Sequence, residues 1–173
     1  MEIVGNFIRE LRAIKVTEDV PKAGRRPLAD LDEQTAGCIQ ASKDFVDVER
    51  TLTAWRVCLG SGAWNGIPVW IHGDLLKTNL LVKNGKLSAV IDFGSAGQGD
   101  PAFDLVPAWS VFHERERQAF RRLLDPDTET WNRARGYALH QSVLIIPYYH
   151  ETYPEFTQMA IRTLNEVLFD LSR

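Results

Sequence analysis

The sequence contains few cysteines, no long apolar run and no excess of positive charge. Cys38 and Cys58 are too few for a disulfide framework or a cluster of thiolate metal ligands, so we expect both to pack inside a cytoplasmic protein. No apolar stretch approaches the roughly 20 residues that cross a bilayer, and the N-terminus lacks the pattern of a signal peptide. The sequence therefore predicts no membrane partner.

The charge and the histidines exclude two further classes of site. The formal net charge is −3, whereas a protein that binds nucleic acid needs a basic face, so we expect no nucleic acid partner. A mildly acidic surface suits a cationic small molecule instead. The four histidines do not show the paired spacing of a zinc site.

Hydrophobic spacing predicts a fold of the α+β class that is mainly helical, with one small β-hairpin. The 173 residues, 45% apolar and 25% charged, are enough for a single domain, residues 1–173, with a substantial core. Apolar residues at helical spacing and capping signals predict helices at residues 2–14, 45–59, 115–124, 129–150 (kinked at Pro147) and from 154 on, with a further helix start at Asp100-Pro101. Residues 17–37 are rich in proline, glycine and charge and are expected to form a loop with at most a short helix.

The hairpin lies within the stretch from Trp70 to Gly94. Asn84-Gly85 between two apolar runs is typical of a type I′ turn, in which both central residues need positive φ. A two-residue turn pairs Lys83 with Lys86 and, counting outward, Asn79 with Val90. One face is then apolar, made of Leu80, Val82, Leu87, Ala89 and Ile91. The other face carries Asn79 and Asp92 as diagonal neighbours, roughly 7–8 Å apart at the backbone, and Asp74 lies in the loop that enters the hairpin.

The polar residues of this stretch form a known set of motifs. "HGDLLKTN" fits the pattern H-x-D-L-x-x-x-N, "IDFG" follows 18 residues after Asp74, and "GDPAFDL" comes next. This set resembles the aminoglycoside phosphotransferase family, a kinase-like group that phosphorylates small molecules. "FIRELRAI", "GIPVWIHGDL" and "LVPAWSVF" resemble the C-terminal lobe of the same family. The resemblance covers nearly the entire chain and implies a protein-kinase-like C-terminal lobe.

The resemblance implies a role for each polar residue. Asp74 would accept the proton of the substrate hydroxyl or orient that hydroxyl toward the γ-phosphate of ATP. Asn79 and Asp92 would hold Mg²⁺ that bridges the ATP phosphates, since hard oxygen ligands suit this ion. His72 would hold the loop in place, and Asp104 would tie the loop to the following helix.

Each role has a structural alternative. Asp74, Asn79 and Asp92 are residue types that favour turns, although their joint spacing and shared hairpin argue against that explanation. Asp104 could act only on the dipole of a helix, and Asp100 is expected to be a helix cap rather than a site residue.

The family resemblance also implies a missing part. The chain starts where the C-terminal lobe of the family starts, so we expect the N-terminal nucleotide-binding lobe to be absent. "GSGAWNG" at residues 60–66 misses the spacing of a phosphate-binding loop and is interpreted as a connector. Two partners would fit, a second copy of the chain or a separate N-terminal lobe, and apolar surface left open by the missing lobe would promote dimerisation.

Three functions remain open at this point. The first is ATP-dependent phosphorylation of a hydroxyl on a small molecule, such as an aminoglycoside-like antibiotic or a related metabolite. The second is a truncated, non-catalytic remnant that binds a ligand or a partner. The third is a metallohydrolase that uses His72, Asp74 and Asp92, for which additional histidine ligands are lacking.

The family places the acceptor pocket among the C-terminal helices. The candidate lining residues are Trp109, Tyr148, Tyr149, Glu151 and Glu155. Acidic groups would suit an aminoglycoside, and aromatic groups would suit a macrolide or a sugar. The alternative for Glu151 and Glu155 is that they are solvated surface charges, so the sequence does not identify the acceptor.

Overall fold

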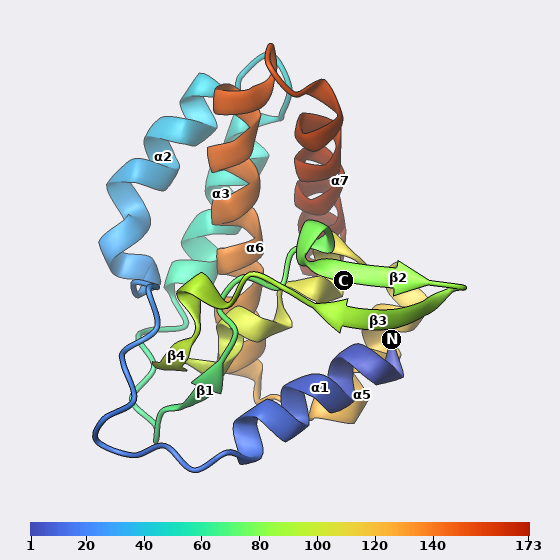
Figure 1. Ribbon diagram of the computed structural model, residues 1–173. Helices are drawn as coiled ribbons and strands as arrows, with labels where there is room; N and C mark the ends of the chain where they lie inside the picture. The colour runs from blue at the N-terminus through green and yellow to red at the C-terminus, as the bar shows by residue number, and fades with distance from the viewer.

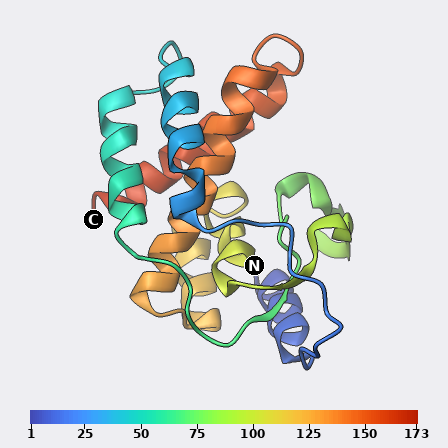
Figure 2. The ribbon, with the colours of Figure 1, turned by 90° about the vertical axis from the view of Figure 1, so that its left-hand side faces the viewer.

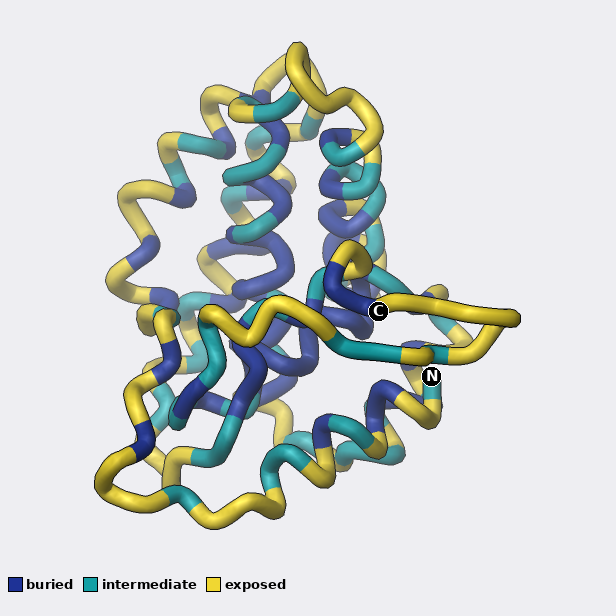
Figure 3. The backbone as a smooth tube through the Cα atoms, viewed as in Figure 1, coloured by how far each residue is buried: buried dark blue, intermediate teal, exposed yellow.

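Two long antiparallel helices form the centre of the fold (Figure 1). The computed structural model describes all residues, 1–173, and its longest helices are α6 (Thr128–Tyr149) and α7 (Pro154–Leu171). The Asp127 side chain accepts a hydrogen bond from the backbone N–H of Thr130 and caps α6, and Pro154 occupies the first turn of α7. Both helices match the predicted positions. Helix α6 is buried along most of its length (Figure 3), because other helices pack around it.

A helical pair covers one side of α6. Helix α2 (Asp32–Ala41) and helix α3 (Val48–Leu59) lie side by side against it (Figure 2). Helix α3 begins at Val48 rather than at the predicted residue 45, because Asp47 caps it. The second half of residues 17–37, predicted as a loop with room for a short helix, contains a 3₁₀ turn (Leu28–Leu31) and the start of α2, which continues beyond it to Ala41. Leu28, Leu31, Thr35 and Ile39 are buried there at helical spacing, so packing on α6 outweighs weak local propensity.

The N-terminal helix and two short helices close the other end of the molecule. Helix α1 (Glu2–Ala13) matches its prediction and buries Val4, Gly5 and Ile8. Helix α5 (Glu114–Leu124) lies beside it. The helix predicted after Asp100-Pro101 is a 3₁₀ turn (Pro101–Leu105) followed by the short helix α4 (Pro107–Ser110). None of the helices combines the length and the apolar composition that crossing a bilayer requires.

The hairpin has the predicted turn but a shifted register. Strands β2 (Leu80–Lys83) and β3 (Lys86–Val90) are joined by Asn84 and Gly85, which both have positive φ. The predicted pairing holds from Lys83 to Val82, and a bulge then pairs Leu81 with Ala89 and Leu80 with Val90. Because of this extra residue, the carbonyl of Asn79 accepts a hydrogen bond from the N–H of Ile91, one residue later than expected. The predicted apolar face is therefore split, and Val82 and Ile91 are exposed.

A second small sheet was not predicted from the sequence. Strand β1 (Val69–Ile71) pairs antiparallel with β4 (Gly97–Gly99). The segment from Pro21 to Pro27, which we call the 21–27 loop, joins this sheet through a parallel bridge between Lys22 and Gln98. Backbone hydrogen bonds run from Ala23 N to Gln98 O and from Gln98 N to Pro21 O, both 2.9 Å long. These bonds fix the position of a loop that carries three cationic side chains.

The 21–27 loop lies so close to β4 that only glycine fits at position 97. A Cβ on Gly97 would lie 2.4 Å from the carbonyl oxygen of Pro21 and 2.8 Å from the backbone nitrogen of Ala23. We expect Gly97→Ala to lower the free energy of unfolding by about 1–3 kcal/mol, since backbone atoms cannot move aside as a side chain can. Urea denaturation followed by circular dichroism measures this change.

The matched control is Gly37→Ala in helix α2, where a new Cβ would meet no atom within 4 Å. This variant should keep or raise the stability, because alanine favours helix over glycine by up to about 1 kcal/mol. Equal effects of the two substitutions would show that the 21–27 loop is not held against β4.

A buried histidine joins α2 to α6. The His140 Nδ1 atom lies 2.7 Å from Thr35 Oγ1, and this hydroxyl donates to the Leu31 carbonyl, so the Nδ1–H must be the donor to Thr35. Burial, together with Arg26 and Arg25, lowers the pKa of His140 to about 4. The folded protein therefore holds this side chain neutral.

The stability should decline in mild acid for this reason. The pKa of His140 is lower in the folded than in the unfolded chain, so its contribution is present above pH 6.5 and is lost as the pH falls toward 4. Between pH 7 and pH 5 we expect a loss of roughly 1–2 kcal/mol in the free energy of unfolding. His140→Gln should flatten the plot of unfolding free energy against pH in this range, whereas His150→Gln, at an exposed position, should not. A wild-type profile that is flat from pH 7 to pH 5 would contradict the assignment.

Candidate active site

A buried carboxylate holds the loop that follows β1. The Asp104 side chain is completely buried and accepts hydrogen bonds from the backbone N–H groups of His72 (2.9 Å) and Gly73 (2.8 Å). Burial raises the pKa of Asp104, while these two hydrogen bonds and the nearby Arg12 act in the opposite direction. Asp104 thus links residues 72–73 to the 101–105 turn through two backbone donors. Asp104 therefore does more than interact with a helix dipole, the alternative role considered for it above.

His72 links the same loop to the segment that carries Asp92. Its ring is buried, Nδ1 accepts from the N–H of Asp74 (3.2 Å), and Nε2 lies 3.0 Å from the carbonyl oxygen of Ile91. Because a carbonyl can only accept, these bonds make Nε2 the donor and Nδ1 the acceptor of the ring. The ring packs against Phe93, with centroids 4.5 Å apart. Neither nitrogen is left for a substrate or a metal.

Gly73 allows the chain to turn into the site. Its φ is +76°, and a Cβ there would lie 2.9 Å from the carbonyl oxygen of Ser95. A side chain at this position would be strained both by the backbone conformation and by the contact. The turn directs the next residue, Asp74, toward Asn79.

Asp74 and Asn79 are in direct contact. The Asn79 Nδ2 atom donates to the Asp74 carboxylate (Oδ2, 3.0 Å) and to the Asp74 backbone carbonyl (2.8 Å). All hydrogen bonds of the Asn79 side chain use Nδ2, so its Oδ1 is free to accept. The Asn79 side chain is nearly buried, which fixes this orientation.

Asp92 follows the residue that pairs with Asn79 across the hairpin. Its neighbour Ile91 donates to the Asn79 carbonyl, and Asp92 itself has a left-handed backbone (φ 63°, ψ 65°). The Asp92 side chain is exposed and does not cap the following turn. A carboxylate and a free amide oxygen in this arrangement are the kind of ligands that Mg²⁺ takes, with water completing its shell. No group of three His, Cys, Asp or Glu side chains is positioned to hold a metal.

Arg25, which was not predicted from the sequence, contacts the Asp74 carboxylate. Its Nη2 atom lies 2.6 Å from Asp74 Oδ1, and its Nε donates to the carbonyl of Gly73 at 2.6 Å. Both side chains are about one-quarter exposed. Arg25 belongs to a charged stretch with no local motif, and only the attachment of the 21–27 loop to β4 brings it to Asp74.

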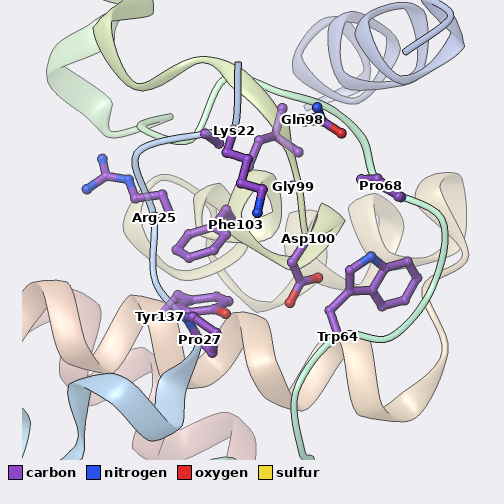
Figure 4. Close-up of a pocket in the computed structure, with 12 residues that line it drawn as sticks. Lys22, Arg25, Pro27, Trp64, Pro68, Gln98, Gly99, Asp100, Phe103 and Tyr137 are labelled. Carbon is purple, nitrogen blue, oxygen red and sulfur yellow. The ribbon is translucent and has the colours of Figure 1, made fainter. Parts of the chain in front are cut away.

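Two cavities flank Arg25 and share Phe103 and Tyr137 as a common wall. The first has a volume of about 370 Å³ and extends toward Lys22, Trp64 and Asp100 (Figure 4). The second, of about 240 Å³, lies toward α2 and is bounded by Arg26, Gln34, His140 and Gln141. The Phe103 and Tyr137 rings are stacked, with centroids 3.6 Å apart. Arg25, which lines both cavities, links them to Asp74.

The predicted substrate residues do not line these cavities. The prediction for Trp109 is wrong: its side chain is completely buried, donates to Asp170 (3.2 Å) and packs against Trp131. Helix α4 turns it into the core against α7, a tertiary contact that its local sequence does not reveal. The other four, Tyr148, Tyr149, Glu151 and Glu155, lie around the turn between α6 and α7. There Tyr148 is 74% exposed and Glu151 is exposed, as the surface-charge alternative predicted.

The family of the chain follows from comparison with known proteins. The model of a family described as the phosphotransferase enzyme family matches residues 1–138. An aminoglycoside 3'-phosphotransferase from Escherichia coli is 30% identical over 143 residues, which cover 73% of this chain and 51% of that protein. An uncharacterized protein, YcbJ from Bacillus subtilis (strain 168), is 30% identical over 141 residues, 79% of this chain and 44% of that protein. The chain thus spans about half the length of these relatives.

Solved structures share the fold. A macrolide 2'-phosphotransferase type I superposes with a TM-score of 0.59 at 19% identity, covering 93% of this chain and 58% of that one. The apo form of a thermostable mutant of aminoglycoside phosphotransferase APH(4)-Ia gives 0.58 at 17% identity, covering 99% and 64%. At these identities the likeness concerns the fold, and it agrees with the expected mainly helical, kinase-like lobe. Together with the family match, it shows that the chain belongs to the phosphotransferase enzyme family.

Proposed function

We propose that the chain carries the catalytic carboxylate and the metal ligands of a kinase that phosphorylates a hydroxyl group of a small molecule, with ATP as the donor. The observation that carries this proposal is the hydrogen bond from Asn79 Nδ2 to Asp74 Oδ2, which leaves Asn79 Oδ1 free to accept; Asp92 directly follows Ile91, whose N–H donates to the Asn79 carbonyl. One asparagine side chain thereby connects a carboxylate suited to binding a hydroxyl with a pair of oxygens suited to Mg²⁺.

In this proposal Asp74 receives the acceptor hydroxyl. The hydroxyl oxygen forms a bond to the γ-phosphorus of ATP, the bond from that phosphorus to the bridging oxygen of ADP breaks, and the hydroxyl proton passes to Asp74. Asn79 holds the Asp74 carboxylate in position, and Asp104 and His72 hold the backbone on either side of it. Mg²⁺, when bound by Asn79 and Asp92, would neutralise charge on the phosphates.

The metallohydrolase alternative loses support from the same contacts. Both ring nitrogens of His72 are used by backbone groups, so His72 is not a free ligand. A non-catalytic, ligand-binding role remains the second candidate, because Arg25 occupies one oxygen of Asp74. The two functions differ in whether the chain binds Mg²⁺ and nucleotide.

We further propose that the remaining contacts to the nucleotide come from an N-terminal lobe or from a second copy of the chain. Several apolar side chains on and beside the hairpin are exposed and could meet such a partner: Leu81, Val82, Ile91 and Phe93. Light scattering of the purified chain distinguishes a dimer from a monomer.

Metal binding at Asn79 and Asp92 can be tested directly. Mn²⁺ replaces Mg²⁺ at oxygen sites and broadens the NMR signals of nearby nuclei, so titration should broaden the signals of residues 79 and 92 first. Asp92→Ala should weaken this binding by at least about tenfold, because loss of even an outer contact of a metal site costs about 10–100-fold. Calorimetric titration with Mg·ATP should likewise show weaker binding by Asp92→Ala than by the wild type.

Asp44→Ala is the matched control, since Asp44 is an exposed carboxylate outside the site, and it should bind Mn²⁺ like the wild type. Asp74→Asn should also retain Mn²⁺ binding while lowering any measured phosphate transfer by about 10²–10⁴-fold. Unchanged Mn²⁺ binding in Asp92→Ala would refute the proposed metal site.

A further inference from the structure

Each of the two cavities that flank Arg25 is lined by a second cation that has no acidic partner. Lys22 lines the first cavity and forms no ion pair, and Arg26 lines the second and meets only the neutral amide of Gln34, at 3.3 Å. Both residues belong to the 21–27 loop, which backbone hydrogen bonds hold against β4. The backbone that carries both charges is therefore held in place by the β1–β4 sheet.

The acidic groups at these cavities are already neutralised. Asp100 lines the first cavity, but its two oxygens accept from Arg133 at 2.8 and 3.4 Å and from the backbone of Ala102. Arg133 is itself buried between this carboxylate and the ring of Trp64. Asp74 is paired with Arg25. The second cavity has no acidic residue in its lining, and its His140 is neutral at pH 7.

The local charge is thus opposite in sign to the charge of the whole chain. The net charge of −3 favours a cationic ligand, whereas the cavity surface presents two unpaired cations. Short-range charge at a partly enclosed surface dominates recognition, because charges beyond about 8–10 Å are screened at physiological ionic strength. Figure 4 shows Lys22 directed into the first cavity, above Asp100 and facing the Phe103 and Tyr137 rings.

We propose that the hydroxyl acceptor of this phosphotransferase carries a negative group, a carboxylate or a phosphate, attracted by the positive charge that Lys22 and Arg26 place on either side of Arg25. This inference rests on the proposed function and names its class of substrate. Such a ligand would also give Arg25 a second anion to bind, so that Asp74 Oδ1 becomes available to the acceptor hydroxyl. The stacked rings of Phe103 and Tyr137 would contact the carbon skeleton.

A set of sugars that differ mainly in charge tests this assignment. D-gluconate and D-glucose 6-phosphate are anionic, D-glucose is neutral and D-glucosamine is cationic. Each is titrated into the full chain without nucleotide or metal, with binding followed by NMR. We expect the two anions to bind at least about tenfold more tightly than glucosamine, since a hydrogen bond to a charged group contributes enough for such a ratio. Tighter binding of D-gluconate would indicate a carboxylate site, and tighter binding of D-glucose 6-phosphate would indicate a phosphate site.

Variants locate the binding. Lys22→Ala and Arg26→Ala should each weaken binding of the preferred anion by about tenfold, and added salt should weaken it further. Lys43→Ala is the matched control, because Lys43 is an exposed lysine that lines neither cavity, and it should bind like the wild type. Preference for glucosamine, binding of none of the four sugars, or no effect of either variant would overturn the proposal.

The nucleotide is the main competing anion. If Lys22→Ala weakened Mg·ATP binding by the same factor as it weakened anion binding, the two cations would serve the ATP phosphates, and the proposed acceptor class would be wrong. Because the sugar titrations contain neither metal nor nucleotide, they can fail while Asp92-dependent metal binding persists. The reverse result, anion binding without metal binding, would instead count against the phosphotransferase function.

Discussion

The site depends on one buried carboxylate. Asp104 has no access to solvent, yet it accepts the N–H groups of two successive residues, His72 and Gly73. These two N–H groups belong to a sharp turn with positive φ at Gly73. They therefore have no hydrogen-bond acceptor from a helix or a sheet. Unpaired donors in this environment would each cost about 1–3 kcal/mol. The carboxylate therefore determines both the path of the loop and the direction of Asp74, which in turn contacts Asn79, one of the two proposed metal ligands.

A second layer of contacts connects this loop to distant parts of the chain. His72 reaches forward to Ile91, which precedes Asp92, and Ile91 bonds back to Asn79. The proposed base and metal ligands are thus joined by backbone hydrogen bonds as well as by the amide of Asn79. A bulge in the hairpin is part of this arrangement, because it brings Ile91 rather than Val90 opposite Asn79.

The charge around Asp74 illustrates why net charge is a poor guide to a ligand. The chain is acidic overall, but the 21–27 loop, which carries the arginine paired with Asp74, is basic. The carboxylates of Asp74 and Asp100 already form ion pairs with Arg25 and Arg133. The sequence pointed to Trp109 and to residues near the α6–α7 turn as substrate-binding residues. The structure instead buries Trp109 in the core, and the four residues near the turn line neither of the cavities that Arg25 lines. The residues that line a cavity come from separate segments of the chain, so the residue type at a single position does not show whether that residue lines a cavity.

The sequence by itself determined the features that depend on neighbours along the chain. Asn84-Gly85 specified the turn because few residues tolerate positive φ, Asp127 and Pro154 marked helix starts, and the spacing of Asp74, Asn79 and Asp92 indicated the family. Only the tertiary structure decided the rest: the bulge that shifts the hairpin register, the helix within residues 28–41, the second sheet and the approach of Arg25 to Asp74. The helix, the second sheet and the Arg25 contact arise from packing or hydrogen bonding between segments far apart in sequence, and the bulge accompanies the hydrogen bond from Ile91 to Asn79. Their free energy depends on a partner that no local pattern encodes.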